Sequence, residues 1–455
     1  MILRNLGRPL MISNKQKSIN ALQGYSVFIW GARMTGLGAL RVLNSKDISV
    51  AGFIDSDSAF VGKEVRGLPV HQPLTFLEAL TKAKNPAIFV AVALKEEEIF
   101  NLLNKLGITN IPVLSFQDEK SPYYTIDILS SCNLKCASCP HSIEDHGVPK
   151  GSMTLSLFKE VVDKIILESP DISHISLYSW GEPLLHPYID EVVQYIHNKN
   201  IAVALSSNLS IRFDDRLDRL IEQNPDYLKV SLSGYYPDAY NNTHEGGDIN
   251  LVKSNLYRLR YLLDKYRANT LVDINYHLYR DNSGINLEKF RELANELGFV
   301  MSETYALVMP LERVLSYFDG NPDLQTQQLE ENLLVTIREG VEASSKSRLP
   351  KNFCPFRENQ ININADLSVP VCCTVFQRDE NVVAQNFLKS TLEQINQAKK
   401  RVTTCDKCMK LALPEYNMGF NRPAWDVKAK LKSITDTGLG LKKQEKKIKI
   451  QAAYE

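Results

Sequence analysis

The sequence predicts an α/β protein in three parts, followed by a lysine-rich tail over residues 416–455. A parallel sheet is expected over residues 1–119, a partial (β/α)6 TIM-type barrel over residues 120–345, and a small cysteine-rich domain over residues 346–415. Short β-rich runs alternate with helical stretches through the first two parts, which is the pattern of crossover connections and parallel sheets. The chain has 455 residues, more than one core usually organises.

The N-terminal part contains β-rich runs that predict four strands: Ser26–Gly31, Ile48–Asp55, Pro86–Val92 and Ile108–Phe116. Gly31 and Gly36 follow the first run, and Asp55 ends the second. In a parallel sheet, such glycines let a phosphate approach a helix N-terminus, and such a carboxylate accepts ribose hydroxyls. The glycine spacing departs from G-x-G-x-x-G, so a scaffold without a ligand is an equal alternative.

The second part contains β-rich runs that predict six further strands: Tyr123–Ser130, His174–Tyr178, Ile201–Ser206, Tyr227–Ser233, Leu271–Tyr279 and Met301–Val308. Amphipathic stretches such as Leu157–Leu167 lie between them. In barrels of parallel strands, the chemistry is carried at the carboxyl ends of the strands. Polar or thiol side chains stand at four of these ends: Cys132, Glu182, Asn208 and Ser233.

Three of the eight cysteines, Cys132, Cys136 and Cys139, lie within eight residues directly after the first barrel strand. A four-iron cluster needs four ligands, so three thiolates leave one iron open. An open coordination position is where a substrate or cofactor binds a metal. A zinc knuckle or a set of buried thiols is the alternative for three cysteines taken alone.

The segment Cys132-Asn-Leu-Lys-Cys136-Ala-Ser-Cys139-Pro140 resembles the cluster loop of the radical S-adenosylmethionine (radical SAM) superfamily. The resemblance extends over the whole barrel region. It implies a 4Fe-4S cluster that binds S-adenosylmethionine (SAM) and cleaves it reductively to a 5′-deoxyadenosyl radical, which abstracts hydrogen from a substrate. It also implies an electron donor such as flavodoxin or ferredoxin. The protein supplies the binding and the shielding, and the cofactor supplies the chemistry.

The same resemblance identifies residues at later strand ends. Trp180-Gly181-Glu182-Pro183 is similar to the family segment that receives the amino group of the methionine moiety. The other expected cofactor contacts are Ser207, Asn208, Ser231 and Ser233. Taken singly, Gly181-Glu182-Pro183 and Asn208 are better explained as parts of ordinary turns; it is their joint appearance at consecutive strand ends that favours the resemblance.

The last quarter of the chain resembles the auxiliary-cluster domains called SPASM or twitch. The resemblance implies one auxiliary 4Fe-4S cluster held by Cys354, Cys372, Cys405 and Cys408. Cys373 is the alternative to Cys372. A structural zinc site is the alternative to the cluster, because paired Cys-x-x-Cys units are what zinc ribbons use.

Tyr279, Arg280 and Asp281 follow the fifth barrel strand and are the candidates to face the substrate or to accept a proton. No ligand or base role is assigned to the histidines near the predicted site, because a lone histidine is more often a satisfied polar residue. They are His141, His146, His174, His186 and His244.

The N-terminal part resembles the nucleotide-sugar-binding Rossmann-like domains attached to sugar acyltransferases and some methyltransferases, through Gly31, Gly36 and Asp55. This resemblance implies a bound nucleotide or nucleotide sugar. It favours oxidation or epimerisation of a carbohydrate or nucleotide-linked small molecule. A peptide-modifying maturase is the alternative enzyme, and a zinc or iron–sulfur binding module is the alternative without catalysis.

Composition indicates where in the cell the protein is expected and which binding partners are not expected. Hydrophobic residues make up 44% and charged residues 23%, the balance of a globular protein. The longest apolar stretch, Pro86–Leu94, is too short to span a bilayer, and no signal peptide is expected. A cytoplasmic protein is therefore predicted, in which cysteines bind metal sooner than they form disulfides. With 53 basic and 53 acidic residues, no global field favours nucleic acid.

Overall fold

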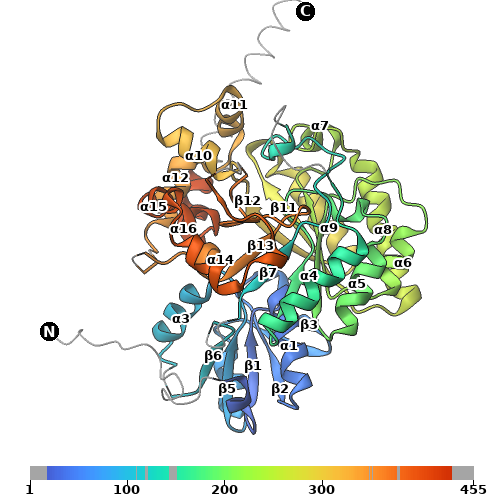
Figure 1. The fold of residues 1–455 in the computed structure, drawn as a ribbon, viewed down its shortest axis with the longest axis vertical. Coiled ribbons are helices and arrows are strands. Elements are labelled where there is room, and N and C mark those ends of the chain that lie inside the picture. The colour runs from blue at the N-terminus through green and yellow to red at the C-terminus, as the bar shows by residue number, and fades with distance from the viewer. Residues whose placement is uncertain are drawn as a thin grey trace, which may run out of the picture.

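The computed structural model describes residues 18–108, 110–117, 121–142, 151–347, 349–350, 352–376 and 380–432. An N-terminal sheet lies below an open barrel, and the C-terminal segment lies along one side of that barrel (Figure 1). The predicted α/β class is confirmed, and a strand forms within every run in which one was expected. No helix of the described residues is both long and apolar enough to cross a membrane.

The N-terminal sheet has the strand order β3-β4-β2-β1-β5-β6. Alternate residues of β1 face two different helical layers, as a parallel sheet covered on both faces requires. Val27 and Ile29 pack with α1, whereas Phe28 and Trp30 pack with α2 and α3. The elements are β1 Ser26–Trp30, α1 Met34–Ser45, β2 Val50–Ile54, β3 Glu64–Val65, β4 Leu68–His71, α2 Phe76–Lys82, β5 Pro86–Val90, α3 Glu96–Lys105 and β6 Val113–Ser115. The short β3–β4 hairpin was not predicted.

The barrel sheet has the order β12-β11-β10-β9-β8-β7-β13, and all of its strand pairs are parallel. Six strands are those expected: β7 Tyr123–Ile126, β8 His174–Ser176, β9 Ala202–Ser207, β10 Tyr227–Leu232, β11 Leu271–Leu278 and β12 Val300–Tyr305. The seventh, β13 Gln360–Ile363, comes from the predicted cysteine-rich domain and pairs with β7. The C-terminal segment therefore adds one strand to the barrel sheet.

Helices follow most of the barrel strands and bury apolar side chains against the sheet. Thr154 begins the first of them by accepting a hydrogen bond from Leu157 N at 3.2 Å. These helices are α4 Leu155–Glu168, α5 Ile189–Asn198, α6 Arg216–Glu222, α7 Pro237–Asn241, α8 Ile249–Tyr266 and α9 Ile285–Glu296. The C-terminal elements are α10 Leu311–Phe318, α11 Leu324–Asn332, α12 Ile337–Ser344, α13 Pro355–Glu358, β14 Val369–Pro370, β15 Val382–Ala384, α14 Leu392–Lys399, α15 Thr403–Lys410 and α16 Leu413–Asn417.

The first part of the expected tail is packed on the protein. Trp425 is buried between the rings of Tyr305 and Tyr416, with centroid distances of 5.5 and 5.7 Å. Residues 433–455 lie outside the described residues.

The carboxyl end of the N-terminal sheet docks against the amino ends of the barrel strands. Arg33, directly after β1, donates from Nε to Asp273 Oδ2 at 2.8 Å and from Nη2 to Ser302 Oγ at 2.7 Å. Asp273 and Ser302 lie near the starts of β11 and β12. Gly38 of α1 approaches the barrel so closely that a Cβ there would lie 2.0 Å from the carbonyl oxygen of Ser173. The two sheets are therefore joined by a buried ion pair and by a close backbone contact.

Arg33→Met should lower the free energy of unfolding by about 3 kcal/mol, because it leaves a buried carboxylate without its cation. The side chain of Asp273 is only 1% exposed. Urea denaturation followed by circular dichroism measures the change. Lys82→Met, at the exposed Lys82–Glu78 pair of α2, is the matched control and should not change the midpoint. Equal midpoints for the two variants would contradict the proposed importance of the Arg33–Asp273 pair.

Candidate functional site

The loop after β7 carries Cys132, Cys136 and Cys139, and it lies over the loop after β10. Lys135 N donates to Glu245 O at 2.9 Å, and Ala137 N donates to Thr243 O at 3.3 Å. Cys139 N donates to Cys136 O at 2.8 Å and closes a turn that holds these two thiols near each other. All three cysteines are half-buried. The cysteine loop is thus held by its backbone at the carboxyl end of the barrel, as the sequence predicted.

The chemistry of these three thiols suits a metal cluster. Leu134 N and Asn208 Nδ2 lie 3.4 and 3.6 Å from Cys132 Sγ, where each donates a hydrogen bond to sulfur. Burial raises the pKa of Cys132 to about 12 and that of Cys139 to about 11. Burial, followed by the two neighbouring thiols, raises the pKa of Cys136 further. The thiols therefore stay protonated at neutral pH unless a metal provides the positive charge that ionises them.

Gly181 and Glu182 follow β8 and lie against the cysteine loop. A Cβ on Gly181 would stand 1.6 Å from the carbonyl oxygen of Leu129, so only glycine fits. Glu182 is buried, and its two carboxylate oxygens accept hydrogen bonds from Leu184 N at 3.0 Å and Asn208 N at 2.8 Å. Burial raises the pKa of Glu182 to about 7 despite these bonds. Pro183 then begins a short 3-10 helix, Pro183–Leu185.

The four expected cofactor residues after β9 and within or after β10 lie in different environments. Asn208 is the one that reaches the cysteine loop, since its Nδ2 also donates to Asn133 Oδ1 at 3.0 Å. Ser207 Oγ accepts from the backbone N–H two residues on. Ser231 Oγ lies 3.4 Å from Ser206 Oγ, on the neighbouring strand. Ser233 is fully buried.

Ser233 is bonded to the loop that supports the cysteines. Its hydroxyl bonds to Thr243 Oγ1 and lies 2.9 Å from His244 Nδ1. His244 is stacked on Tyr240 with ring centroids 4.7 Å apart. Burial lowers the pKa of His244 to about 3, so the ring is neutral. These contacts give His244 a structural place beneath the site.

The sequence analysis missed Asp127. It is buried at the end of β7, and its Oδ1 lies 3.4 Å from Gly181 N, which donates to it. Burial raises the pKa of Asp127 to about 7. The signal was present, because an aspartate within an apolar strand needs a partner.

Of the three residues expected after β11, Tyr279 lies at the cysteine loop. Its buried hydroxyl bonds to the Ser138 side chain, and burial raises the pKa of Tyr279 to about 12. Arg280 and Asp281 are exposed in the 3-10 helix Arg280–Asn282, and Arg280 Nη1 donates to Glu331 O at 3.0 Å. Tyr279 is thus fixed beside the loop as a neutral phenol.

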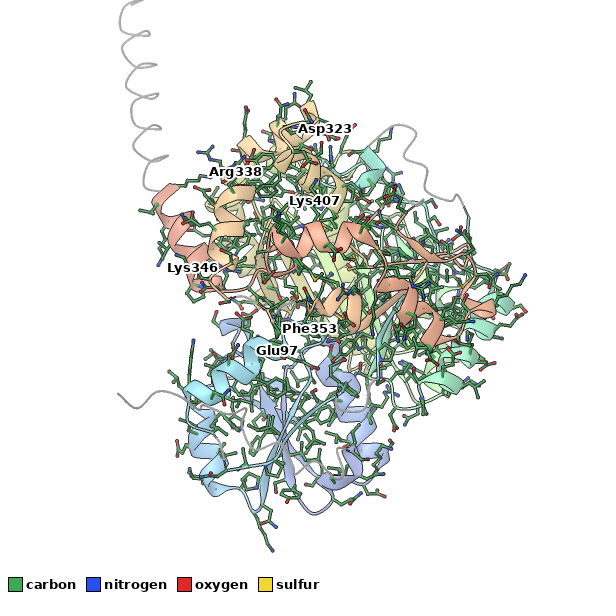
Figure 2. All side chains as sticks on the ribbon, turned by 60° about the vertical axis from the view of Figure 1, so that its left-hand side comes forward. Glu97, Asp323, Arg338, Lys346, Phe353 and Lys407 are labelled. Carbon is green, nitrogen blue, oxygen red and sulfur yellow. The ribbon has the colours of Figure 1, made fainter. Side chains whose placement is uncertain are left out.

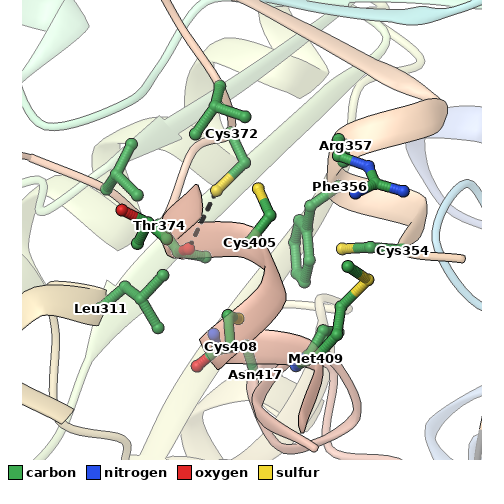
Figure 3. A pocket seen from close by; sticks show the side chains of 14 residues that line it. Leu311, Cys354, Phe356, Arg357, Cys372, Thr374, Cys405, Cys408, Met409 and Asn417 are labelled. Atoms are coloured by element: carbon green, nitrogen blue, oxygen red, sulfur yellow. Dashed lines mark hydrogen bonds between the residues drawn. The ribbon is translucent and has the colours of Figure 1, made fainter. Parts of the chain in front are cut away.

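The second cysteine set lines one pocket. Four thiols from three segments surround it: Cys354, Cys372, Cys405 and Cys408 (Figure 3). Cys372 Sγ lies 3.1 Å from Thr374 Oγ1. Burial raises the pKa of Cys354 to about 12, with Cys372 as the second cause. Cys373 is not among the residues that line the pocket.

Neither cysteine set is arranged to hold a single metal ion. Across the part of the chain that the structure describes, no three His, Cys, Asp or Glu side chains have the spacing that holds one metal ion. The thiols gather around two sites, and at neither site do three of them lie close enough together to bind one ion.

The expected nucleotide residues of the N-terminal sheet lie at the docking surface. Asp55 accepts hydrogen bonds from Ala32 N at 3.0 Å and from Asp57 N at 2.9 Å, and it pairs with Arg33 Nη1 at 3.5 Å. Gly31 has a φ of +112°, and a Cβ on Gly36 would lie 1.9 Å from its carbonyl oxygen. The two glycines therefore serve the turn, and Asp55 holds Arg33 at the barrel contact, which favours the scaffold alternative.

The pKa of Asp127 predicts a pH dependence for the metal-free protein. A carboxyl whose pKa rises from 3.8 to about 7 on folding binds its proton more tightly in the native state. The free energy of unfolding should therefore fall as the pH rises from about 4 to 7. Asp127→Asn should make this fall shallower, as measured by urea denaturation at several pH values. Asp238→Asn, at an exposed position, is the control. An unchanged pH profile in Asp127→Asn would refute the prediction.

The chain is similar to a known family and to several known proteins. The family described as the Radical SAM superfamily matches residues 126–274. AdoMet-dependent heme synthase of Methanosarcina barkeri is 26% identical over 187 residues, which are 40% of this chain and 49% of the relative. The tungsten-containing aldehyde ferredoxin oxidoreductase cofactor-modifying protein of Pyrococcus furiosus is 29% identical over 120 residues, 26% of this chain and 32% of the relative. The chain thus spans less than half the length of these relatives.

Among solved structures, Streptococcus suis SuiB bound to S-adenosylmethionine has a TM-score of 0.44 and 12% identity to this chain. The match covers 70% of this chain and 79% of SuiB.

Proposed function

The chain contains a radical SAM domain, and from this premise we propose that it is an enzyme that cleaves SAM reductively and abstracts a hydrogen atom from its substrate. The observation that carries the proposal is the cysteine loop itself. Its three thiols are gathered by one tight turn and by N–H donors at the carboxyl end of an open parallel barrel. Three ligands suit a 4Fe-4S cluster with one open iron.

Different residues of the cysteine loop and of its surroundings would bind the cluster and SAM. When bound to such a cluster, SAM supplies a 5′-deoxyadenosyl radical. Cys132, Cys136 and Cys139 would hold the cluster. The backbone of Gly181 would receive the methionine moiety beside it. Asn208 fixes the thiol of Cys132, and the neutral hydroxyl of Tyr279 stands next to Cys136 without adding charge.

The second cysteine set would hold one auxiliary 4Fe-4S cluster through Cys354, Cys372, Cys405 and Cys408. Support comes from the single pocket that all four thiols line and from their burial, which favours a metal-bound thiolate over a free one. A structural zinc site uses the same ligands. Metal analysis decides between the two.

For the substrate, a carbohydrate or nucleotide-linked small molecule is proposed first and a peptide second. The carbohydrate or nucleotide-linked class is favoured by the resemblance of the N-terminal part to nucleotide-sugar-binding domains. Because Gly31 and Gly36 pack within the turn and Asp55 pairs with Arg33, they give no separate support to a nucleotide-linked substrate. Both classes should therefore be tested side by side, with 5′-deoxyadenosine formation in the presence of each candidate as the measure.

Cys136→Ala should abolish reductive cleavage of SAM, because a cluster with two protein ligands is not held. The measurement is 5′-deoxyadenosine formed by anaerobically reconstituted protein with dithionite. Wild-type protein without reductant is the control. Unchanged 5′-deoxyadenosine in Cys136→Ala would end the proposal.

Replacing Cys132, Cys136 and Cys139 together by alanine should leave about four irons per chain, because the auxiliary cluster has its own complete set of ligands. Iron, sulfide and zinc are measured on the reconstituted triple variant. One zinc per chain and no iron would instead support the structural zinc site.

A further inference from the structure

Helix α10 stands between the two cysteine sets and contacts the segment that follows Cys372. Leu311 N, at the start of α10, donates to Thr374 O at 2.8 Å. Glu312 Oε1 accepts from Phe376 N at 2.8 Å. Thr374 in turn bonds to the thiol of Cys372. The amino end of α10 is therefore fixed by the loop that carries one of the second-site cysteines.

The opposite end of α10 contacts another second-site element. Asp319, directly after the helix, pairs with Lys407, which lies between Cys405 and Cys408 on α15. Lys407 and Asp323 lie on the same side of the molecule (Figure 2). Both ends of α10 thus contact segments that carry second-site cysteines.

Arg313 extends from α10 to the radical-site loop. It is buried, with 5% exposed area, and its Nη1 donates to Ala137 O at 3.2 Å, between Cys136 and Cys139. Its position is set by Asp323, whose carboxylate oxygens lie 3.3 and 3.4 Å from Nε and Nη2. A planar guanidinium can hold a carbonyl and a carboxylate at once, which a lysine ammonium does with less fixed geometry.

A second branch of the same contact holds the other side of Cys139. Arg313 also bonds to Gln325 Oε1, and Gln325 Nε2 donates to Ser142 Oγ at 2.9 Å. Ser142 Oγ donates to Cys139 O at 2.7 Å. Arg313 therefore contacts the turn from Cys136 to Ser142 on both sides of Cys139. It contacts Ala137 directly and Ser142 through Gln325.

We propose that Arg313 is the positioning residue of the cysteine loop, and that α10 couples the loop to the second cysteine site. The inference rests on the proposed radical SAM function. The packing supports it, because the ring of Phe376 lies against that of Trp180 with centroids 5.6 Å apart, so the second-site segment also contacts the segment before Glu182. Loss of the second site releases α10, and Arg313 then no longer fixes the Cys136–Cys139 turn.

The first experiment measures the loop without any metal. Hydrogen–deuterium exchange of the metal-free full chain is followed in peptides that cover residues 133–142. Arg313→Met should raise exchange there by roughly tenfold, because the contacts to Ala137 and Gln325 are lost. Arg313→Lys should give an intermediate rate. Arg338→Met is the matched control, since Arg338 is exposed and stacks on Tyr317 and Phe318 on α10 without contacting the loop.

The second experiment measures the reconstituted protein. Arg313→Met should keep the irons of the second site. Its 5′-deoxyadenosine formation should fall on the order of tenfold to a hundredfold, because the radical-site ligands are misplaced. The change that SAM causes in the electron paramagnetic resonance spectrum of the reduced radical-site cluster should shrink in parallel. Arg338→Met should match the wild type in all three readouts.

Coupling is tested by combining Arg313→Met with Cys405→Ala and Cys408→Ala. If α10 transmits the state of the second site, the cysteine changes alone reduce SAM cleavage and add little further loss when Arg313 is already absent. Fully additive losses would overturn the coupling, and wild-type exchange in Arg313→Met would overturn the positioning role. Failure of the wild-type protein to cleave SAM would instead refute the proposed function, while the exchange result would still decide the role of Arg313.

Discussion

The buried carboxylate of Glu182 is the contact on which the geometry of the cysteine site depends. A carboxylate with 3% exposed area is costly to bury unless both of its oxygens are satisfied, and here they bind the N–H groups of Leu184 and Asn208 on two different loops. Its own N–H donates to Ser131 O at 2.9 Å, directly before Cys132. One residue therefore fixes the loops after β7, β8 and β9 relative to one another. The contact with Asn208 N also helps to hold the residue whose side chain reaches the Cys132 thiol.

Local signals in the sequence were enough for the strands β7 to β12 and for the place of the cysteine loop at their carboxyl ends. Strand alternation and the spacing of Cys132, Cys136 and Cys139 depend on near neighbours in the chain, and the ends of parallel strands meet at one rim. The pairing of β13 with β7 was not predictable in this way, because the two strands are far apart in the sequence and β13 is only four residues long. Long-range pairing of a short strand leaves no periodic signal.

Glycine turns gave a local prediction that was correct and a functional expectation that the structure does not favour. Gly31 has the positive φ that the turn requires, and Asp55 ends the next strand as expected. The N–H group that could bind a phosphate or ribose partner, that of Ala32, instead donates to Asp55. A bound ligand and an internal carboxylate accept hydrogen bonds from the same backbone geometry. The sequence alone therefore does not tell whether the turn binds a ligand or Asp55. Ser233 is a similar case, since it stands at a strand end but bonds to His244.

The docking of the N-terminal sheet has a consequence for the open barrel. Arg33 reaches Asp273, which also accepts a hydrogen bond from Tyr227 Oη at 2.8 Å, so charged and polar side chains from both sheets occupy the amino end of the barrel strands. Burial alone would lower the pKa of Arg33, but the nearby carboxylates of Asp273, Asp55 and Asp57 raise it above its ordinary value, which keeps the side chain charged. β13 covers the edge of β7, and α10 lies across the side that carries the cysteine loop. The N-terminal part therefore occupies the amino end of the barrel strands, and the C-terminal part borders the cysteine loop at their carboxyl end through Arg313 of α10.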